Sequence, residues 1–353
     1  MSPPRLGQPF VVSSVSTPAG TVPQVSAELT PADFWGTIKV RWGVRRTNYK
    51  VDPGLYALGC PDEKSPVLIS ANYKLSFDTL RSALKGRHLW ILVLDTNGIN
   101  VWCAAGKGTF STAELVRRLQ FSRLEEVVSH RRLIVPQLAA PGVAAHEVKK
   151  LSGFKVTYGP IRAADLPAFI DRGFKANSAM RLKTFSTWER LVLVPVELVA
   201  ALKMAIIVVP IFVFLGGLGG SSGYWDDLMN HGLFAAAALL SGVLAGTVLA
   251  PILLPWLPGR AFALKGTILG LLVALALVFV WNADSMEGFI TLENLAWILI
   301  VSALSAYFSM NFTGASTYTS LSGVKKEMQW AVPLQIAAAA VGLALWSWSL
   351  FTA

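Results

Sequence analysis

Residues 88–110 read HLWILVLDTNGINVWCAAGKGTF, and this stretch decides the fold of the first half of the chain. Its first part, His88–Leu94, is an apolar run with the length of a buried strand. Asp-Thr-Asn-Gly follows at residues 95–98, and the Asn-Gly pair predicts a tight turn because both residues tolerate a positive backbone φ. We therefore expect a buried strand that ends in a turn.

The segment after this turn predicts one short helix. Asn100 has a side chain suited to cap a helix, Trp102–Ala105 supplies a single turn, and Gly106 is expected to end it. Cys103 stands inside this turn. The sequence thus places a thiol just beyond the carboxyl end of a strand.

Short apolar runs and helical patterns alternate through the rest of the first half. The predicted strands are Val67–Ala71, His88–Leu94, Arg132–Pro136 and Phe154–Tyr158. The predicted helices are Phe77–Leu84, Ser111–Gln120, Ala144–Leu151 and Leu166–Phe174. This alternation is typical of an α/β domain with a parallel, Rossmann-like sheet. We expect the domain to span residues 31–190. Residues 1–30, rich in Pro, Ser, Thr and Val, are expected to form a disordered tail.

The loops after Leu94, Pro136 and Tyr158 are the expected binding loops, because ligands of such sheets bind beyond the carboxyl ends of the strands. Small residues recur in all three loops, within Asp95–Phe110, at Gln137–Gly142 and at Gly159-Pro160. Small residues let the backbone approach a ligand closely. The loops therefore favour a large, flat ligand.

The second half of the chain has the composition of a membrane protein. Of 353 residues, 53% are hydrophobic and only 15% are charged, against about 25% in soluble proteins. Five stretches are long and apolar enough to cross a bilayer: Leu193–Leu215, Gly232–Leu254, Ala261–Trp281, Phe289–Phe308 and Ala331–Leu350. We expect an all-α, five-helix transmembrane domain over residues 191–353.

The charge distribution predicts the orientation of these spans. Lys and Arg exceed Asp and Glu by 12 in residues 1–190, whereas residues 191–353 hold two more acidic than basic residues. The first and third connections between the spans are acidic, and the second and fourth are basic. By the positive-inside rule, the first domain is expected in the cytoplasm and the C-terminus outside the cell inner membrane.

Two charged residues, Glu197 and Lys203, fall inside the first predicted span. Charges inside a membrane often serve a function. Near the end of a span, long side chains instead extend toward water. The sequence leaves both roles open.

The cysteines and histidines narrow the chemistry. Cys60 and Cys103 are too few for a disulfide framework or for an iron–sulfur cluster held by four thiolates. The four histidines lie far apart in the sequence, which argues against a zinc site. Gly106-Lys107-Gly108-Thr109 does not fit the phosphate-binding P-loop, because Val101 stands where that pattern requires its first glycine.

At this point the residues show a resemblance. Residues 100–110, NVWCAAGKGTF, are similar to the cap-helix signature of the mercury-methylating corrinoid proteins. Residues 51–56 and 70–78 resemble the corrinoid-binding domain of the corrinoid iron–sulfur proteins, and residues 311–320 and 322–328 resemble segments that both families share. The similarity covers about residues 33–353, and its specific part is the motif that contains Cys103.

Two features depart from the iron–sulfur relatives. Those proteins carry an N-terminal domain with a four-cysteine cluster, whereas this chain has only two cysteines and a membrane half, as the mercury-methylating family does. Cys60 stands where the relatives tend to have Asn, and we interpret it as a turn residue.

The resemblance implies a corrinoid-dependent methyltransferase whose cofactor is cobalamin. It implies that the Cys103 thiolate is the lower axial ligand of the cobalt and that the methyl group passes from methyl-Co(III) to Hg(II), forming methylmercury. A thiolate is a soft, electron-rich ligand, which suits transfer of methyl to an electrophile as a carbanion equivalent, or as a radical plus an electron. Lys107, four residues further on the same helical face, would help to neutralise the thiolate.

The expected corrinoid contacts come from the strand ends and from the Cys103 motif. They are Asn72, Ser76, Asn100, Val101, Trp102, Cys103, Ala104, Ala105, Gly106, Lys107, Gly108, Thr109, Gln137, Leu138, Ala139, Gly142, Gly159 and Pro160. The loop at residues 311–330, polar and cytoplasmic by the predicted topology, is expected to touch the corrinoid or a partner.

The resemblance also implies partners. A ferredoxin-like protein with two four-iron clusters would supply electrons and could donate Hg(II), and a folate-type compound or its methyltransferase would supply methyl groups. Membrane lipid is expected around the spans, and no nucleic acid is expected. Two alternatives remain open: a corrinoid methyl carrier of a one-carbon pathway of the acetyl-CoA type, and a non-enzymatic cobalamin-binding membrane protein.

Overall fold

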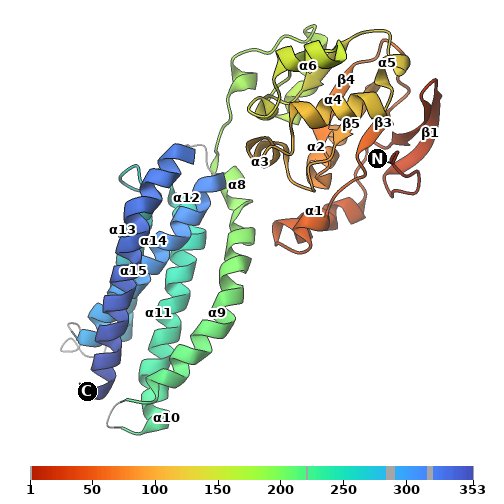
Figure 1. Cartoon of the computed structure of the whole chain (residues 1–353). Helices are drawn as coiled ribbons and strands as arrows, with labels where there is room; N and C mark the ends of the chain where they lie inside the picture. The colour runs from red at the N-terminus through yellow and green to blue at the C-terminus, as the bar shows by residue number, and fades with distance from the viewer. Residues whose placement is uncertain (1, 220–221, 284–290, 316–320, 353) are drawn as a thin grey trace. The chain divides into compact units, whose positions relative to one another are not determined.

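The computed structural model describes residues 2–219, 222–283, 291–315 and 321–352 (Figure 1). The chain divides into two compact units. The first consists of residues 1–40 and 44–183, and the second of residues 184–353 together with 41–43. The division falls before the predicted border at residue 190, because the buried Arg190 side chain already donates to the Ile252 carbonyl of the helical unit (3.2 Å).

The first unit is built on one sheet of seven strands in the order β1-β2-β3-β5-β4-β6-β7. Their bounds are β1 Val11–Thr17, β2 Gly20–Val25, β3 Gly54–Leu58, β4 Val67–Ala71, β5 Leu89–Leu94, β6 Arg132–Val135 and β7 Lys155–Tyr158. Strands β5, β4, β6 and β7 run parallel, as predicted. The sheet as a whole is mixed, because β3 pairs antiparallel with β5 and β1 pairs antiparallel with β2.

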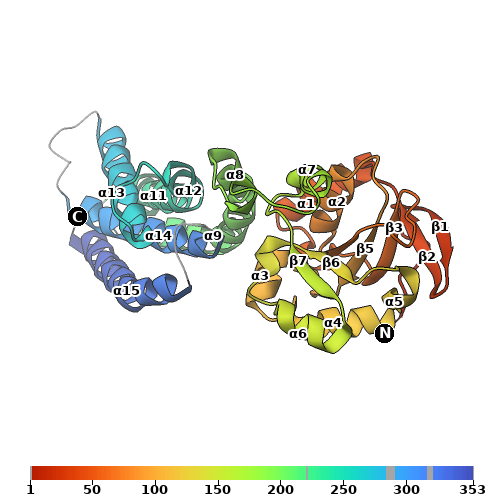
Figure 2. The same ribbon diagram turned by 90° about the horizontal axis from the view of Figure 1, so that it is seen from above.

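Helices cover both faces of this sheet (Figure 2). They are α1 Pro31–Arg41, α2 Lys74–Ala83, α3 Val101–Gly106, α4 Thr112–Phe121, α5 Leu124–Val127, α6 Ala145–Ser152 and α7 Leu166–Asp171, with 3₁₀ turns η1 Arg46–Asn48, η2 Gln137–Ala139, η3 Ala163–Asp165 and η4 Ala179–Arg181. Alternate residues of β5 point to opposite faces: Trp90 packs with α3, α4 and α6, and Ile91 packs with α2 and α7. The α/β class predicted from the sequence is confirmed.

The prediction of a loosely ordered tail at residues 1–30 is wrong. Residues 11–25 form the hairpin β1–β2, and Gln24 and Val25 pair in parallel with Ala57 and Leu58 of β3. The prediction failed because these strands are rich in Ser and Thr, and their order comes from pairing with β3, itself an unpredicted strand. Pairing between distant segments leaves only a weak local signal.

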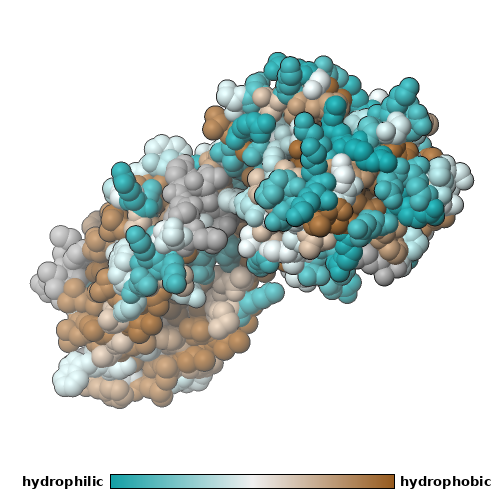
Figure 3. Space-filling view, turned by 45° about the horizontal axis from the view of Figure 1, so that its top comes forward, coloured by the Kyte–Doolittle hydropathy of each residue, from teal (hydrophilic) through white to brown (hydrophobic). Residues whose placement is uncertain are grey.

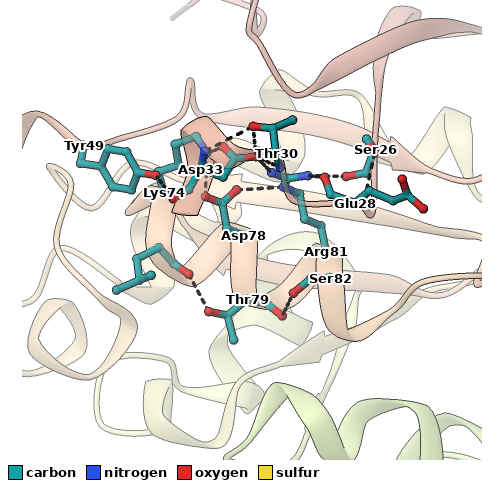
Figure 4. A network of polar contacts seen from close by, with 11 residues as sticks. Ser26, Glu28, Thr30, Asp33, Tyr49, Lys74, Asp78, Thr79, Arg81 and Ser82 are labelled. Atoms are coloured by element: carbon teal, nitrogen blue, oxygen red, sulfur yellow. Dashed lines mark hydrogen bonds and ion pairs between the residues drawn. The ribbon is translucent and has the colours of Figure 1, made fainter. Parts of the chain in front are cut away.

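A buried ionic network fastens the N-terminal segment to α2 (Figure 4). Asp33 of α1 accepts hydrogen bonds from Lys74 and from Arg81 (2.8 Å to Nη2). Asp78 accepts from the same two cations, at 2.6 Å from Lys74 Nζ and 2.8 Å from Arg81 Nε. Arg81 is fully buried and also donates to the carbonyls of Ser26 and Glu28, each at 2.7 Å. Two carboxylates and two cations thus neutralise one another inside the protein.

The network sets the protonation of Asp33. Burial by itself would raise the pKa of Asp33, but hydrogen bonds from Lys74 and Thr30 outweigh burial and hold that pKa far below its ordinary value. The carboxylate is therefore charged in the folded protein. Because the folded pKa lies below the unfolded one, the stabilisation is complete above about pH 4 and is lost as the pH falls further.

The second unit is helical. Its elements are α8 Thr187–Leu191, α9 Val194–Gly216, α10 Tyr224–Asp227, the π-helix η5 Leu228–Gly232, α11 Leu233–Leu244, the π-helix η6 Ala245–Leu249, α12 Ala250–Leu253, α13 Phe262–Trp281, α14 Leu292–Asn311, the 3₁₀ turn η8 Phe312–Ala315 and α15 Leu321–Thr352. Five helical segments are long and apolar enough to cross a membrane: Thr187–Gly216, Tyr224–Leu253, Phe262–Trp281, Leu292–Asn311 and Ser322–Thr352. Each overlaps one predicted span, and the surface of this unit in Figure 3 is largely hydrophobic.

Small residues set the spacing of α13 and α14. A Cβ atom added at Gly266 would lie 2.7 Å from Ala306 Cα, and one added at Gly270 would lie 2.7 Å from Ser305 Cβ. Close backbone approach through Gly, Ala and Ser is how helices pack in lipid, where the hydrophobic effect between helices is absent.

The predicted polar loop at residues 311–330 is corrected in part. Asn311 ends α14, and residues 321–330 are the first turns of α15; residues 316–320 lie outside the described part of the chain, as do Asp284 and Glu287 of the preceding connection. One of the polar residues there, Glu327, is buried, and its carboxylate accepts from the Ala263 amide (2.6 Å) at the start of α13.

We predict that Asp33→Asn destabilises the first unit by about 3 kcal/mol at neutral pH, because it leaves two buried cations short of one countercharge. The free energy of opening, measured by hydrogen exchange at the amides of the central strands, is expected to fall by this amount. The difference in free energy of opening between the variant and the unmodified chain should become smaller below about pH 4. Asp171→Asn, which breaks the exposed pair with Arg87, is the control and should change little. A free-energy difference that does not depend on pH would contradict this role of the Asp33 charge.

Candidate functional site

The carboxyl ends of the four parallel strands meet at one edge of the sheet. Asn72 follows β4, Asp95 follows β5, Pro136 follows β6 and Gly159 follows β7. This carboxyl edge is where the sequence placed the binding loops. The helix α3, which carries Cys103, follows directly from the β5 loop.

A tight turn joins β5 to α3. The Ile99 amide donates to the Thr96 carbonyl (3.1 Å), and Asn97 and Gly98 have φ angles of +56° and +71°. Two positive φ angles in a row define a type I′ turn, which Asn-Gly favours. A Cβ at residue 98 would lie 2.6 Å from the Thr47 carbonyl oxygen, so glycine is required there by space as well as by φ.

The buried side chain of Asn72 holds this turn in place. Its Oδ1 accepts from the amides of Thr96 and Gly98 (both 3.0 Å) and from the Thr96 hydroxyl (2.9 Å). Its Nδ2 donates to Asp95 Oδ1 (3.0 Å). Asn72 is 1% exposed, so its hydrogen-bonding capacity goes to the turn. The sequence singled out Asn72 as a cofactor contact, and the structure gives it a positioning role for the loop.

Glu114 of α4 fixes the other side of the same loop. Its Oε1 accepts from the Asp95 amide (3.0 Å) and from Arg118 Nη2 (2.8 Å). Burial would raise the pKa of Glu114, but hydrogen bonds from Arg117, the Asp95 amide and Arg118 outweigh it, and the pKa is lowered. Sequence reasoning missed this residue. The signal available, Ser111 three residues before Glu114, indicates only a capping box.

Helix α3 presents Cys103 at the surface. Asn100 caps the helix as predicted, accepting from the Cys103 amide through Oδ1 (2.9 Å). Ala104 and Ala105 are buried against the sheet, whereas Cys103 is exposed with a free thiol. The turn predicted at residues 102–105 is confirmed and runs from Val101 to Gly106.

The end of α3 differs in detail from the prediction. Gly106 is the last helical residue, and the residue with a left-handed backbone is Gly108, with φ of +77°. The amides of Thr109 and Phe110 donate to the Ala104 carbonyl (3.0 and 3.1 Å) and close the helix. A Cβ at Gly106 or at Gly108 would meet no atom within 4 Å. The surface beside these two glycines is therefore open.

The loop after β6 packs directly on α3. A Cβ at Gly142 would collide with the Phe110 carbonyl oxygen and approach Ala105 Cα to 3.1 Å. The Gly142 carbonyl accepts from the Thr112 amide (3.0 Å). Gly142 is thus needed for the loop after β6 to pack against α3. Ala139 in the same loop is buried.

The structure separates the other predicted contacts into two groups. Gly106, Lys107 and Gly108 are exposed beside Cys103, and Val101, Trp102 and Thr109 are half-buried around it. In the second group, Gly159 and Pro160 are buried, and Ser76 lies in the first turn of α2, the helix on the other face of the sheet. Gln137 and Leu138 are half-buried in η2, and Gln137 accepts a hydrogen bond from Arg181. Because η2 contacts α3, Gln137 and Leu138 lie near the first group, whereas Ser76 lies apart from it.

The second thiol lies at the opposite edge of the sheet. Cys60 follows β3, whose end is paired with the start of β5 (Leu58 with Leu89). Its amide donates to His88 Nδ1 (2.9 Å), and its side chain is exposed. Among the described residues, His, Cys, Asp and Glu side chains form no group of three or more that could hold a metal ion.

Comparison with known proteins places the site in a recognisable segment. Residues 42–170 match the family described as CO dehydrogenase/acetyl-CoA synthase delta subunit. This segment contains β3 to β7 and every loop of the carboxyl edge, and it leaves out the β1–β2 hairpin and the helical unit.

Several archaeal proteins named acetyl-CoA decarbonylase/synthase complex subunit gamma are similar to this chain. The protein of Methanopyrus kandleri is 32% identical over 129 residues, which are 36% of this chain and 28% of that protein. The Archaeoglobus fulgidus protein is 32% identical over 143 residues, 39% and 30% of the two chains. The Methanocaldococcus jannaschii protein is 36% identical over 92 residues, 26% and 19%. The match spans less than a third of each relative.

We predict that Asn72→Ala loosens the turn that carries α3. It removes the acceptor of three hydrogen bonds and should lower the free energy of opening at the amides of Thr96 and Gly98 by about 3 kcal/mol. Hydrogen exchange at these two amides measures the effect. Asn177→Ala, which removes a single bond to the Met180 amide, is the control and should leave the turn unchanged. Unaltered protection of these two amides from exchange in Asn72→Ala would contradict the positioning role of Asn72.

Proposed function

We propose that the α/β domain binds a corrinoid at the carboxyl edge of its sheet and takes part in methyl transfer. One observation carries this proposal: the exposed, free thiol of Cys103 stands on a capped helix at this edge, inside the segment that resembles acetyl-CoA synthase subunits. The cofactor would be cobalamin, and the Cys103 thiolate would bind its cobalt.

The residues present fit such a group. A thiolate is a soft ligand, and the open surface at Gly106 and Gly108 leaves room for a broad, flat molecule beside it. Asn100 fixes the Cys103 backbone, and Lys107 lies exposed at the end of the same helix, where its charge offsets that of a thiolate. A bound corrinoid supplies a cobalt-bound methyl group that can pass to an acceptor.

The acceptor that we propose is Hg(II), with methylmercury as the product. Support comes from the motif at residues 100–110, which is similar to the signature of the mercury-methylating corrinoid proteins. Hg(II) is an electrophile, so it takes a methyl group together with its bonding electrons. Bound through the electron-rich thiolate of Cys103, the cofactor would favour transfer in this direction.

Each turnover then needs two electrons and a new methyl group from outside the chain. We propose a ferredoxin-like protein with two four-iron clusters as the electron donor and as a possible source of Hg(II). A folate-type methyl donor or its methyltransferase would restore the methyl group. The excess of 12 basic over acidic residues in the first 190 favours an acidic protein partner through electrostatic attraction.

We propose that the five apolar helices anchor the protein in the cell inner membrane. Their lengths and composition support this. The alternation of acidic and basic connections supports a cytoplasmic α/β domain and an external C-terminus.

A second candidate function is a corrinoid methyl carrier of an acetyl-CoA type pathway. The relatives favour it, since all those compared belong by name to the acetyl-CoA decarbonylase/synthase complex. Such a carrier would pass methyl to a nucleophilic acceptor, for which a thiolate ligand is not required. A cobalamin-binding membrane protein without catalytic activity is the third candidate.

We predict that replacement of Cys103 abolishes methylation of mercury. The full chain, reconstituted with cobalamin, a methyl donor and a reductant, should form methylmercury from Hg(II), and Cys103→Ala should form none above background. Cys60→Ser is the matched control, because it removes the exposed thiol at the opposite edge, and it should retain activity. Full activity of Cys103→Ala would refute the ligand role of the sulfur.

The same assay separates the candidate functions. Methyl transfer to a nucleophilic thiol in place of Hg(II), with Cys103→Ala as active as the unmodified chain, would favour the methyl carrier. Tight binding of cobalamin without methyl transfer to either acceptor would favour the non-enzymatic protein.

A further inference from the structure

Helix α1 carries large aromatic side chains on its outer face. Phe34 is 64% exposed and Trp35 is 59% exposed, and their rings contact edge to face at 6.5 Å between centroids. Val44, in the turn that follows the helix, is 51% exposed. Isolated apolar residues on a surface need no explanation, but adjacent Phe and Trp side chains form a patch that water solvates poorly.

The ionic network explains why these rings face outward. Asp33 and Val40 lie seven residues apart on one face of α1, and both are buried. Asp33 is held by Lys74 and Arg81, which fixes the rotation of the helix (Figure 4). With that face turned inward, Phe34 and Trp35 must lie on the outer face. The exposure of the aromatic rings is therefore built into the fold.

Basic residues surround the patch. Residues 30–50 contain five Lys or Arg and one acid, Asp33, whose charge is already neutralised in the network. Lys39 of α1 and Arg45 of the following turn are exposed, and neither forms an ion pair within the described part of the chain. We name the set Phe34, Trp35, Lys39, Val44 and Arg45 the α1 surface.

This combination has the chemistry of a membrane interface. Tryptophan and phenylalanine partition to the boundary between headgroups and acyl chains, and Lys and Arg are attracted to anionic lipids. An acidic protein would satisfy the charges but would not require the exposed apolar rings. Phe34, Trp35 and Lys39 precede the segment at residues 42–170 that matches the acetyl-CoA synthase subunit family, and Val44 and Arg45 lie at its start.

We infer that the α1 surface binds the anionic headgroup region of a lipid bilayer, with Phe34 and Trp35 at the acyl boundary. The inference rests on the proposed anchoring of the chain in a membrane. It adds a second membrane contact, made by the α/β domain itself. Such a contact would restrict the domain's tumbling and fix which edge of its sheet partners can reach.

Spin-label depth measurements on the full chain test this inference. A nitroxide is attached at Trp35→Cys and, in separate samples, at Lys149→Cys on the exposed side of α6 and at Ile207→Cys on the exposed side of α9. The background carries Cys60→Ser and Cys103→Ala, and Phe34 stays in place. The protein is placed in nanodiscs of phosphatidylglycerol or of phosphatidylcholine. Collision rates with oxygen and with a water-soluble nickel chelate report the depth of each label.

In phosphatidylglycerol discs, the label at residue 35 should be shielded from the nickel chelate and accessible to oxygen. In phosphatidylcholine discs, it should be less shielded from the nickel chelate and less accessible to oxygen. Lys39→Gln with Arg45→Gln should lower the ratio of lipid-seated to water-exposed label about 25-fold, at about fivefold for each charge. Lys149→Gln with Lys150→Gln on α6 is the matched control and should not change this ratio.

Each alternative outcome contradicts a defined part of the account. A label at residue 35 as accessible to nickel as the one at residue 149, while the label at residue 207 lies in lipid, would overturn the inference and leave the membrane anchoring intact. Equal shielding at residue 35 in both lipids would overturn the role of anionic headgroups. A label at residue 207 outside the lipid would overturn both the anchoring and this inference.

Discussion

The amide side chain of Asn72 is the contact on which the candidate site depends. It accepts three hydrogen bonds and donates one, all to residues 95–98, and it joins the end of β4 to the turn after β5. In a buried setting, an amide whose hydrogen bonds are all made specifies one geometry, because any displacement leaves polar groups without partners. This turn determines where α3 begins, and therefore where the Cys103 sulfur lies.

The local part of this arrangement could be predicted from the sequence. Strands β4 to β7, the Asn-Gly turn, the Asn100 cap and the short helix at Cys103 all have signals within a few residues of one another. The remaining features depend on distant partners. Asn72 lies 23 to 26 residues before the groups that it binds, Glu114 acts on a loop outside its own helix, and β2 becomes a strand only beside β3. No local pattern encodes such pairings, so an orderly N-terminal hairpin appeared as a loosely ordered tail.

Small residues show the same limit in another form. Glycines in the binding loops suggested room for a ligand, and the structure assigns them different tasks. Gly142 allows α3 to pack, Gly98 allows the turn to form, and only Gly106 and Gly108 border open space. The sequence alone cannot distinguish a glycine that admits a ligand from one that admits another part of the protein. The family match at residues 42–170 covers all of these positions and supports a shared framework, whereas the β1–β2 hairpin, α1 and the apolar helices lie outside the matched segment.

The central claim is a bond between the Cys103 sulfur and cobalt, and X-ray absorption at the cobalt edge of the cobalamin-loaded protein tests it most directly. The account predicts a sulfur scatterer in the first coordination shell of the unmodified chain and of Cys60→Ser, and its loss in Cys103→Ala. A shell without sulfur in the unmodified chain, or one that keeps its sulfur in Cys103→Ala, would contradict it.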